Sequence, residues 1–408
     1  MNNNNLAIMG GQPVRNEYLP YGQQWLDDHD IQAVIETLKS PYLTQGPKIA
    51  EFEEKVANYV GANYAVAFCN GTAGLHAACY AAGVSEGDEV ITTPITFVAS
   101  ANCVRYLGAN PVFVDINNST YNIDPEKIED KITSKTKAII PVDFTGQPAD
   151  IKRIKEIADK YKLVVIQDAA HSLGATYDHE YLNMEEGNSC KVGAIADMTM
   201  FSFHPVKHIT TGEGGMIVTN SEVYAKKLRS FRSHGITSDR SIMLEDHGPW
   251  YYEMLELGYN YRMTDIQASL GISQLNKLDA YIKIRRNYAN IYNQAFQGLS
   301  GIIIPYQLNG THSSWHLYSL RFELQKFTAN RRQIFDALRA ENIGVHVHYI
   351  PVHLQPYYRE RGYGKGLCPI AEQWYEEIIT LPLFPKMTMG DIESVIEAVN
   401  KVYYAYKK

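Results

Sequence analysis

The sequence predicts an α/β protein with two parts: a large domain around a mostly parallel central sheet, and a smaller C-terminal α+β domain. From Tyr64 to Asp168, short apolar runs alternate with helical patterns, as they do in successive βαβ units. Near residue 264 this alternation gives way to longer helical segments. The chain has 408 residues, enough for about two domains, and we divide it into 1–263 and 264–408.

The elements of the large domain follow from these patterns. Each expected strand is a short apolar run without alternation, which is typical of a sheet buried on both faces. We expect strands at 64–68, 89–93, 111–115, 138–143, 163–168, 198–203 and 215–220. Helical spacing predicts helices at 72–82, 97–107, 125–131 and 150–161.

The C-terminal part has a different pattern. Residues 264–296 carry apolar side chains at helical spacing and predict one long helix. We expect a strand at 317–324, a helix near 328–341, a strand at 343–350 and a final helix near 388–404.

Composition argues against several classes of protein. The net charge is -7 and no basic block occurs, so nucleic acid is not an expected partner. The five cysteines form no CxxC, which indicates neither a disulfide framework nor a zinc ribbon. No apolar run approaches the roughly 20 residues of a membrane helix, and the apolar patch 6–9 is too short for a signal peptide. We therefore expect a cytoplasmic protein that does not bind membranes.

Lys207 is the first candidate for chemistry. It follows the predicted strand 198–203 in FSFHPVKHITTGEGGM, among aromatic, histidine, threonine and glycine residues. In a pocket of low polarity burial favours the neutral amine, and a neutral amine can form a Schiff base with an aldehyde cofactor. The alternative is a loop lysine whose stem packs on the protein while its amine reaches solvent.

Three further sites fit such a cofactor. Asp168 ends a strand at the sheet edge where α/β proteins bind ligands, and could keep a pyridine nitrogen protonated; a helix cap or a Mg²⁺ ligand is the alternative. The turn 70–73 opens a helix, and its N–H groups with the Thr72 hydroxyl suit a phosphate. Phe97 could stack on a flat ring or serve as a core residue.

Several histidines are candidates for metal ligands. His204 and His208 are four apart, but the proline between them argues against a metal-binding helix. His346 and His348 would share one face of a strand, with His353 nearby. A metal site needs more ligands in place, so we expect no metal and favour substrate-contacting or structural roles.

Taken in order, these motifs resemble the DegT/DnrJ/EryC1/StrS family of sugar aminotransferases. The resemblance runs from YLTQGPKIAEFE (42–53) to HYIPVHLQPYY (348–358) and includes NGTAGLHAA, QDAAHSLGA, FSFHPVKHITTGEGGM and GYNYRMTDIQASLGISQL. It implies the fold type I (aspartate-aminotransferase-like) architecture, pyridoxal 5′-phosphate (PLP) as cofactor in the large domain, and transfer of an amino group.

The resemblance also implies roles for single residues. Lys207 would form the Schiff base with PLP, Asp168 would meet the pyridine nitrogen, and His171 would pack near the ring and its substituents. The remaining contacts to the ring face and the phosphate would come from Phe97, Thr72, Ala73 and Ser202. Asn260, in GYNYRM, would reach the phosphate of the neighbouring subunit's cofactor, which implies a homodimer with a shared active site.

Within the family, FSFHPVK, YLTQGP and VHVHYIPV look most like PseC-type enzymes. Those enzymes aminate C4 of a UDP-linked 4-keto-6-deoxy-N-acetylhexosamine in pseudaminic acid biosynthesis, and we expect glutamate as the amino donor. His208 departs from the subgroup, which more often has proline there. Placement by resemblance gives five candidate sugar contacts: Tyr42, Gln45, Arg262, Tyr318 and His348.

Three alternatives remain open: transamination of a different nucleotide-linked keto-sugar, another PLP reaction such as dehydration, and a non-catalytic sensor or scaffold. Relatives that act as dehydratases carry histidine at the lysine position, whereas this chain has Lys207 followed by His208. The intact set of Lys207, Asp168 and Thr72 argues against a sensor.

Overall fold

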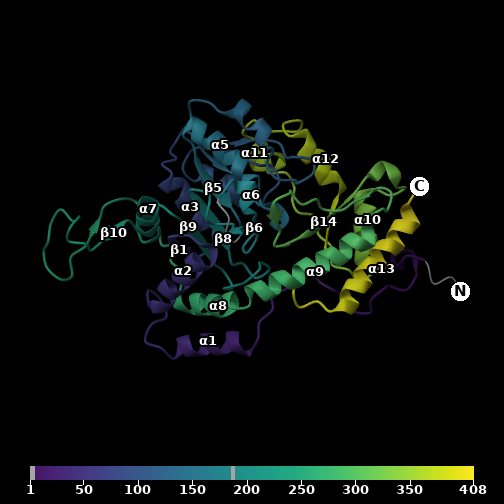
Figure 1. The fold of residues 1–408 in the computed structure, drawn as a ribbon, viewed down its shortest axis with the longest axis horizontal. Coiled ribbons are helices and arrows are strands. Elements are labelled where there is room, and N and C mark those ends of the chain that lie inside the picture. The colour runs from purple at the N-terminus through teal and green to yellow at the C-terminus, as the bar shows by residue number, and fades with distance from the viewer. Residues whose placement is uncertain (1–4, 185–188) are drawn as a thin grey trace.

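The computed structural model describes residues 5–184 and 189–408. A seven-stranded sheet in the order β1-β9-β8-β5-β4-β2-β3 lies at the centre of the larger part (Figure 1). Its strands are β1 (Tyr64–Phe68), β2 (Glu89–Thr92), β3 (Asn110–Phe113), β4 (Thr136–Ile140), β5 (Val164–Asp168), β8 (Met198–Ser202) and β9 (Gly215–Thr219). β9 pairs antiparallel with β1 and β8, and the other neighbours pair parallel. This confirms the predicted fold class.

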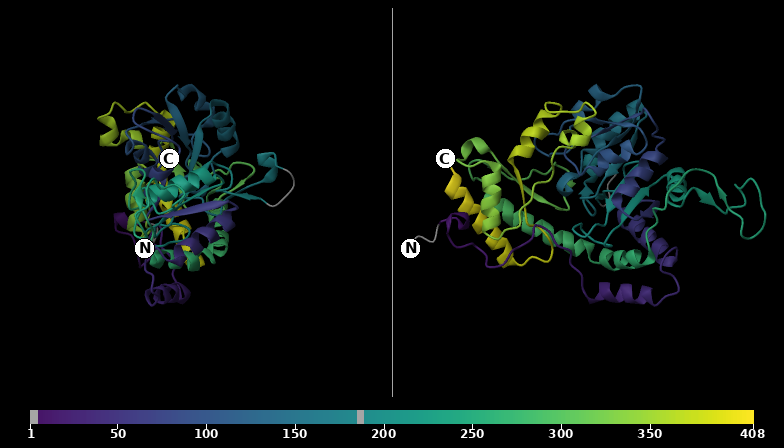
Figure 2. Two further views of the ribbon diagram at one scale, coloured as in Figure 1. Left: turned by 90° about the vertical axis from the view of Figure 1, so that its left-hand side faces the viewer. Right: turned by 180° about the vertical axis from the view of Figure 1, so that it is seen from behind.

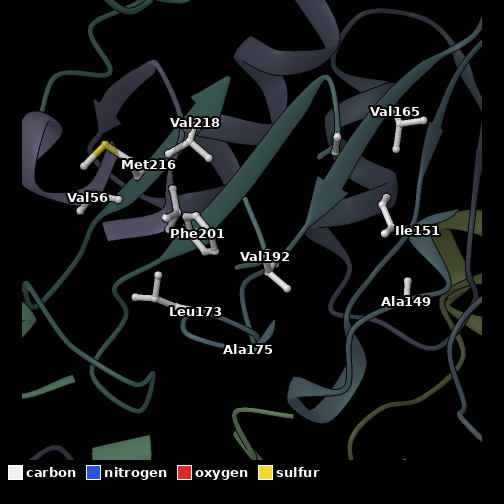
Figure 3. Packing of buried hydrophobic residues seen from close by; sticks show 14 of the residues in the cluster. Val56, Ala149, Ile151, Val165, Leu173, Ala175, Val192, Phe201, Met216 and Val218 are labelled. Carbon is white, nitrogen blue, oxygen red and sulfur yellow. The ribbon is translucent and has the colours of Figure 1, made fainter. Parts of the chain in front are cut away.

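Helices cover both faces of this sheet, which explains why its strands are apolar throughout. On one face α3 (Gly71–Ala81), α4 (Ala99–Arg105) and α7 (Glu222–Arg232) pack on one set of strand residues. On the other face α2 (Pro47–Val60), α5 (Ile151–Tyr161) and α8 (Asp265–Leu275) pack on the alternate set. Figure 3 shows part of this second layer, where Val56 of α2 and Ile151 of α5 flank strand residues such as Val165 and Val218.

A second core lies in the C-terminal part. Its antiparallel sheet has the order β12-β14-β15, formed by β12 (Ile302–Ile303), β14 (Tyr318–Phe322) and β15 (Ile378–Leu381). The helices α9 (Leu278–Phe296), α10 (Arg331–Ala340) and α13 (Met389–Tyr406) surround it. Leu6 and Leu19 from the amino-terminal segment are buried in the same core as residues of α13, the last helix (Figure 2).

The remaining elements are short or peripheral. α1 (Asp28–Leu38) packs on α8. A hairpin of β10 (Ile236–Thr237) and β11 (Glu253–Met254) lies in an arm that projects from the body of the protein (Figures 1 and 2). The others are β6 (Thr176–Tyr177), β7 (Cys190–Lys191), β13 (Thr311–His312), α6 (His179–Leu182), α11 (Pro356–Arg359) and α12 (Pro369–Glu377), with short 3₁₀ turns. Within 5–184 and 189–408, none of the helices combines the length and the apolar character that crossing a membrane requires.

Three predicted elements differ from the structure. The helix expected over 264–296 is two helices, because the Lys277 N–H donates to the Gln274 carbonyl three residues back and breaks the α pattern. The helix expected over 125–131 is two 3₁₀ turns, Pro125–Lys127 and Glu129–Lys131. The strand expected at 343–350 makes only single bridges, from Ile343 to Leu19 and from His346 to Thr380, since its two ends pair with different partners.

The division between domains stays a prediction. α8 and the first turns of α9 contribute Ala268, Leu275, Leu278 and Ile282 to the core of the large sheet. We propose that the helical segment after residue 264 belongs to the large domain up to the middle of α9.

Candidate active site

The candidate site lies at the carboxyl ends of β5 and β8. Asp168 is the last residue of β5 and Ser202 the last residue of β8, and the two strands are hydrogen-bonded neighbours. Lys207 is half-buried in the turn that follows β8. The charges of Asp168 and Lys207 act on each other, so the structure brings together the two residues on which the sequence prediction most depends.

Asp168 is a buried carboxylate with defined partners. The Ser100 hydroxyl donates to Oδ2 at 2.6 Å and the Ala170 N–H donates to Oδ1 at 3.2 Å. Burial raises the pKa of Asp168, while these hydrogen bonds and the Lys207 ammonium act in the opposite direction. A protonated ring nitrogen placed here would favour the charged carboxylate in the same way. Ser100 was not predicted from sequence, because its contact with Asp168 joins two segments that lie far apart along the chain.

Lys207 has the lowered pKa that amine chemistry needs. Burial lowers the pKa of Lys207 to about 8, and the charge of Asp168 partly opposes this shift. A substantial share of the amine is therefore neutral near physiological pH, and only the neutral amine attacks a carbonyl carbon. The charge of Asp168 beside the half-buried Lys207 side chain favours this role over that of a loop lysine.

The turn that opens α3 lies against the end of β8. Asn70 caps the helix, its Oδ1 accepting from the Ala73 N–H at 2.8 Å. A Cβ at Gly71 would lie 3.4 Å from the Ser202 Cβ, and a Cβ at Gly215 would lie 2.5 Å from the Asn70 carbonyl oxygen. Thr72, Ala73 and Ser202 therefore gather in one place, although the Ala73 amide would have to share its proton with Asn70.

An open hollow of about 520 Å³ continues from this turn. Its wall is aromatic and includes His76, whose buried Nε2 lacks a hydrogen-bond partner within 5–184 and 189–408. The lining residues are Asn70, Thr72, Ala73, His76, Tyr106, Tyr259 and Tyr261. The exposed backbone start of α3 and the Thr72 hydroxyl are thus accessible to an anion.

His171 packs among aromatic rings beside the site. Its ring centroid lies 4.3 Å from that of His316, and its Nε2 lies 3.4 Å from the Tyr349 hydroxyl. The Nδ1 atoms of His171 and His316 are buried without a hydrogen-bond partner in the described part of the chain. Burial holds the pKa of both histidines well below the ordinary range, so both rings are neutral. His316, which no sequence motif pointed out, is therefore part of this site.

The other predicted residues are Phe97, expected to stack on the cofactor, and the candidate contacts to the sugar and to the partner's phosphate. Phe97 precedes α4, its side chain 58% exposed and its ring centroid 6.2 Å from that of Tyr349, so one face of the ring is free. Tyr42 and Gln45 are exposed ahead of α2, and Asn260 is exposed at the base of the arm. Arg262 is half-buried. Among the residues that the structure describes, no hydrogen bond joins Tyr42, Gln45, Asn260 or Arg262 to Asp168 or Lys207.

The structure contradicts the role predicted for Tyr318. It was expected to contact the sugar, but its side chain is 0% exposed in the second core, where its hydroxyl donates to Asn293 Oδ1 at 2.9 Å. Its position on β14, paired with Leu381 of β15, points it into the small domain. His348 is also buried, yet the charge of Lys207 reaches it, and burial is the main cause that lowers the pKa of His348 to about 3.

The site fits one kind of small molecule. An amine beside a carboxylate, an exposed aromatic face and a helix start suited to a phosphate match a flat, phosphate-bearing aldehyde with a ring nitrogen. The described residues contain no group of three or more His, Cys, Asp or Glu side chains that could hold a metal ion.

Comparison with known proteins agrees with this chemistry. The profile of the DegT/DnrJ/EryC1/StrS aminotransferase family matches residues 24–400. An uncharacterized protein of Methanocaldococcus jannaschii is 45% identical over 390 residues, covering 95% of this chain and 98% of the relative. The spore coat polysaccharide biosynthesis protein SpsC of Bacillus subtilis is 42% identical over 390 residues, with the same coverage.

Solved structures show the same architecture. Helicobacter pylori PseC, an aminotransferase involved in the biosynthesis of pseudoaminic acid, superimposes with a TM-score of 0.85 at 32% identity, covering 96% of this chain and 100% of the other. Spr1654 of Streptococcus pneumoniae in its PLP form superimposes with a TM-score of 0.86 at 31% identity, covering 95% of this chain and 99% of the other.

Proposed function

The chain belongs to the DegT/DnrJ/EryC1/StrS aminotransferase family and is thus a PLP-dependent sugar aminotransferase, and from that premise we propose its reaction. It moves an amino group from glutamate to C4 of a UDP-linked 4-keto-6-deoxy-N-acetylhexosamine. The observation that carries the chemistry is the amine of Lys207, with its lowered pKa, beside the buried carboxylate of Asp168. The choice of sugar is supported by the similarity to PseC along the whole chain.

The cofactor and the side chains of the site have separate roles in the proposed reaction. When bound, PLP supplies an aldehyde for an amine and a ring that accepts the electron pair released at the reacting carbon. Lys207 anchors the cofactor and, once displaced by the amino donor, takes the proton from the donor's α-carbon at Nζ. In the second half-reaction the same Nζ returns a proton to C4 of the sugar.

The surrounding side chains keep the cofactor in place and in the right protonation state. Asp168 holds a proton on the ring nitrogen, because a buried carboxylate with only two hydrogen-bond donors is stabilised by a cation beside it. The α3 turn with Thr72, Ala73 and Ser202 holds the phosphate. Phe97 covers one face of the ring, and the neutral ring of His171 packs beside its substituents.

The active unit is a homodimer in this proposal. Asn260 is exposed at the base of the arm, where it bridges to Ser233 and has no contact with the site of its own chain among the hydrogen bonds of the described residues. An exposed amide on a projecting arm can reach the cofactor phosphate of a second copy.

A panel of substrates tests the reaction. Purified protein with PLP, glutamate and nucleotide-linked 4-keto-sugars should yield 2-oxoglutarate and an aminated sugar, identified by mass and NMR. Lys207→Ala should abolish turnover, whereas Lys191→Ala, a lysine that packs on the Tyr59 ring, should keep it. A dehydrated sugar that has gained no amino group, or turnover in Lys207→Ala, contradicts the proposal.

A second candidate is the same reaction on a different nucleotide-linked keto-sugar. It is favoured by the 42% identity to SpsC, a protein of spore coat polysaccharide biosynthesis, compared with 32% to PseC. The panel separates the two, because the preferred sugar has the highest kcat/KM.

A further inference from the structure

We propose that Tyr21, together with the exposed ring of His346, forms the wall against which the sugar ring of the substrate stacks, with the buried ring of His348 packed against both. This makes Tyr21 a specificity-determining residue of the amino-terminal segment. The inference rests on the proposed function and deepens it, because it assigns part of the sugar site to a segment that carries no recognised motif.

The segment 19–25 is a strap fixed at both ends. At one end the Leu19 N–H donates to the Asn342 carbonyl at 3.0 Å, and the Leu19 carbonyl accepts from the Gly344 N–H at 2.7 Å. At the other end the Trp25 ring stacks on Tyr281, with centroids 5.3 Å apart, and the Trp25 carbonyl accepts from Gln274 Nε2 at 3.0 Å. The strap thus has a fixed course between the second core and the helices α8 and α9.

Between these anchors the strap crosses the loop that holds Lys207. A Cβ at Gly22 would lie 3.8 Å from the Cβ of Val206, the residue before Lys207. Gln23, Gln24 and Trp25 line a small cavity together with Pro205, Lys207 and His208. The strap therefore packs directly against the loop that carries Lys207 and forms one wall of the cavity beside that residue.

Tyr21 meets two histidine rings at this wall. Its centroid lies 5.3 Å from that of His346 and 5.3 Å from that of His348, and the two imidazoles stack at 4.5 Å. The backbone of Tyr21 is fixed by the Leu383 N–H, which donates to its carbonyl at 3.2 Å. His348 is fixed by Thr380, whose Oγ1 lies 3.1 Å from Nδ1. The half-buried Tyr21 ring and the exposed His346 ring thus lie side by side, and the buried His348 ring packs against both.

The chemistry of this surface suits a sugar ring. Tyr21 is half-buried, so part of its ring remains open. Aromatic rings stack on the C–H faces of a pyranose, while the polar edges of Tyr21 and of the exposed His346 ring can meet its hydroxyl groups. The His348 ring lies 4.8 Å from that of Tyr349, whose hydroxyl lies 3.4 Å from His171 Nε2, so this wall continues to the rings beside the catalytic site.

Measuring the two half-reactions separately tests the inference. Glutamate alone converts the PLP form to the pyridoxamine form, which is followed by absorbance and does not involve the sugar. Tyr21→Ala should leave this half-reaction within about threefold of wild type and raise KM for the preferred keto-sugar about tenfold. Tyr21→Phe should stay within about threefold in both, because the ring remains.

Matched variants distinguish the loss of the Tyr21 ring from a general effect on folding. Tyr21→Leu keeps an apolar side chain without a ring and should behave like Tyr21→Ala, with an unchanged far-UV spectrum and unfolding temperature. Tyr18→Ala and Tyr18→Phe, in the same segment but with the hydroxyl bonded to Arg339, should not change the sugar KM. If Tyr21→Leu matches wild type, or slows both half-reactions equally, the assignment is wrong. If the wild-type protein aminates no keto-sugar of the panel, the proposed function fails and the assignment falls with it.

Discussion

Two opposing effects act on the amine of Lys207. Burial lowers its pKa from the ordinary lysine value to about 8, while the carboxylate of Asp168 pulls it upward. The first effect makes the amine reactive near neutral pH, and the second keeps its proton available for return to a carbon atom. A single lysine can serve as anchor and as acid-base group because burial and the Asp168 carboxylate shift its pKa in opposite directions.

This balance predicts a pH dependence. Only the neutral amine attaches PLP, so the rate of covalent attachment to the apoprotein should rise with pH through a midpoint near 8. In Asp168→Asn the midpoint should fall, because removal of the carboxylate destabilises the ammonium form. Stopped-flow absorbance at a series of pH values measures both midpoints. The control Asp178→Asn, at an exposed ion pair with His312, should not move the midpoint, and an unmoved midpoint in Asp168→Asn would contradict this account.

At the same scale, the sequence predicted some residues of the site and misplaced others. Lys207 and Asp168 follow or end apolar strands, and the carboxyl ends of strands are where such sheets bind ligands. Tyr318 was misplaced because resemblance fixes a position along the chain but not which face of a strand is buried. Ser100 and His316 went unpredicted because their contacts with Asp168 and His171 join segments far apart in sequence.

Among the elements, α3 and β9 show how closely two segments must approach to build a phosphate site. The turn before α3 lies so near β9 that Gly215 has no room for a side chain, since its Cβ would be 2.5 Å from the Asn70 carbonyl oxygen. The same turn lies beside Ser202, which pairs with Gly215 across the sheet. The position of the helix start therefore depends on a glycine in the neighbouring strand.

Gly215→Ala should displace the start of α3 and weaken PLP binding at least tenfold, roughly the effect of a 1.4 kcal/mol loss. Fluorescence titration of the apoprotein with PLP gives the two dissociation constants. Gly364→Ala is the matched control, because a Cβ there has nothing within 4 Å. Equal affinity in Gly215→Ala and wild type would show that the turn tolerates the shift.

How well an element could be predicted depended on its partners. The strands of the central sheet are buried on both faces, so continuous apolar runs identified them. The segment 343–350 has the same apolar character, but it bridges to Leu19 at one point and Thr380 at another and forms no ladder. The break between α8 and α9 at Lys277 could not be predicted from local sequence. The Lys277 side chain pairs with Asp27 and Asp30, a contact across more than two hundred residues of sequence.

For the whole molecule, the projecting arm raises the question of what covers it. Its apolar side chains are strongly exposed, with Leu244 at 88%, Trp250 at 75% and Leu257 at 75%. Several large apolar side chains so strongly exposed on one projecting segment are typical of an interface. A second copy of the chain, which the proposed role of Asn260 requires, would bury it.

Mixed dimers test the shared site. Lys207→Ala and Asn260→Ala should each be inactive, or nearly so, as homodimers. If Asn260 serves the partner's site, unfolding and refolding the two variants together creates mixed dimers in which one site has both Lys207 and Asn260. Activity should then appear in the mixture, measured as 2-oxoglutarate formation. A mixture of Lys207→Ala with Asp168→Asn should stay inactive. Lys207 and Asp168 both act in the site of their own chain, so each site of this mixed dimer lacks one of the two residues. No recovery in the first mixture would place Asn260 in its own chain's site.

The burial of Leu6 and Leu19 beside α10 and α13 has a consequence for how the protein is made. Leu6 and Leu19 leave the ribosome long before α13 does, so the core of the small domain cannot close until α13 has been made. The strap over Lys207 is then drawn into position only after that helix is present. Synthesis thus has a built-in order, in which the sheet that binds the cofactor can form before the wall of the sugar site is assembled.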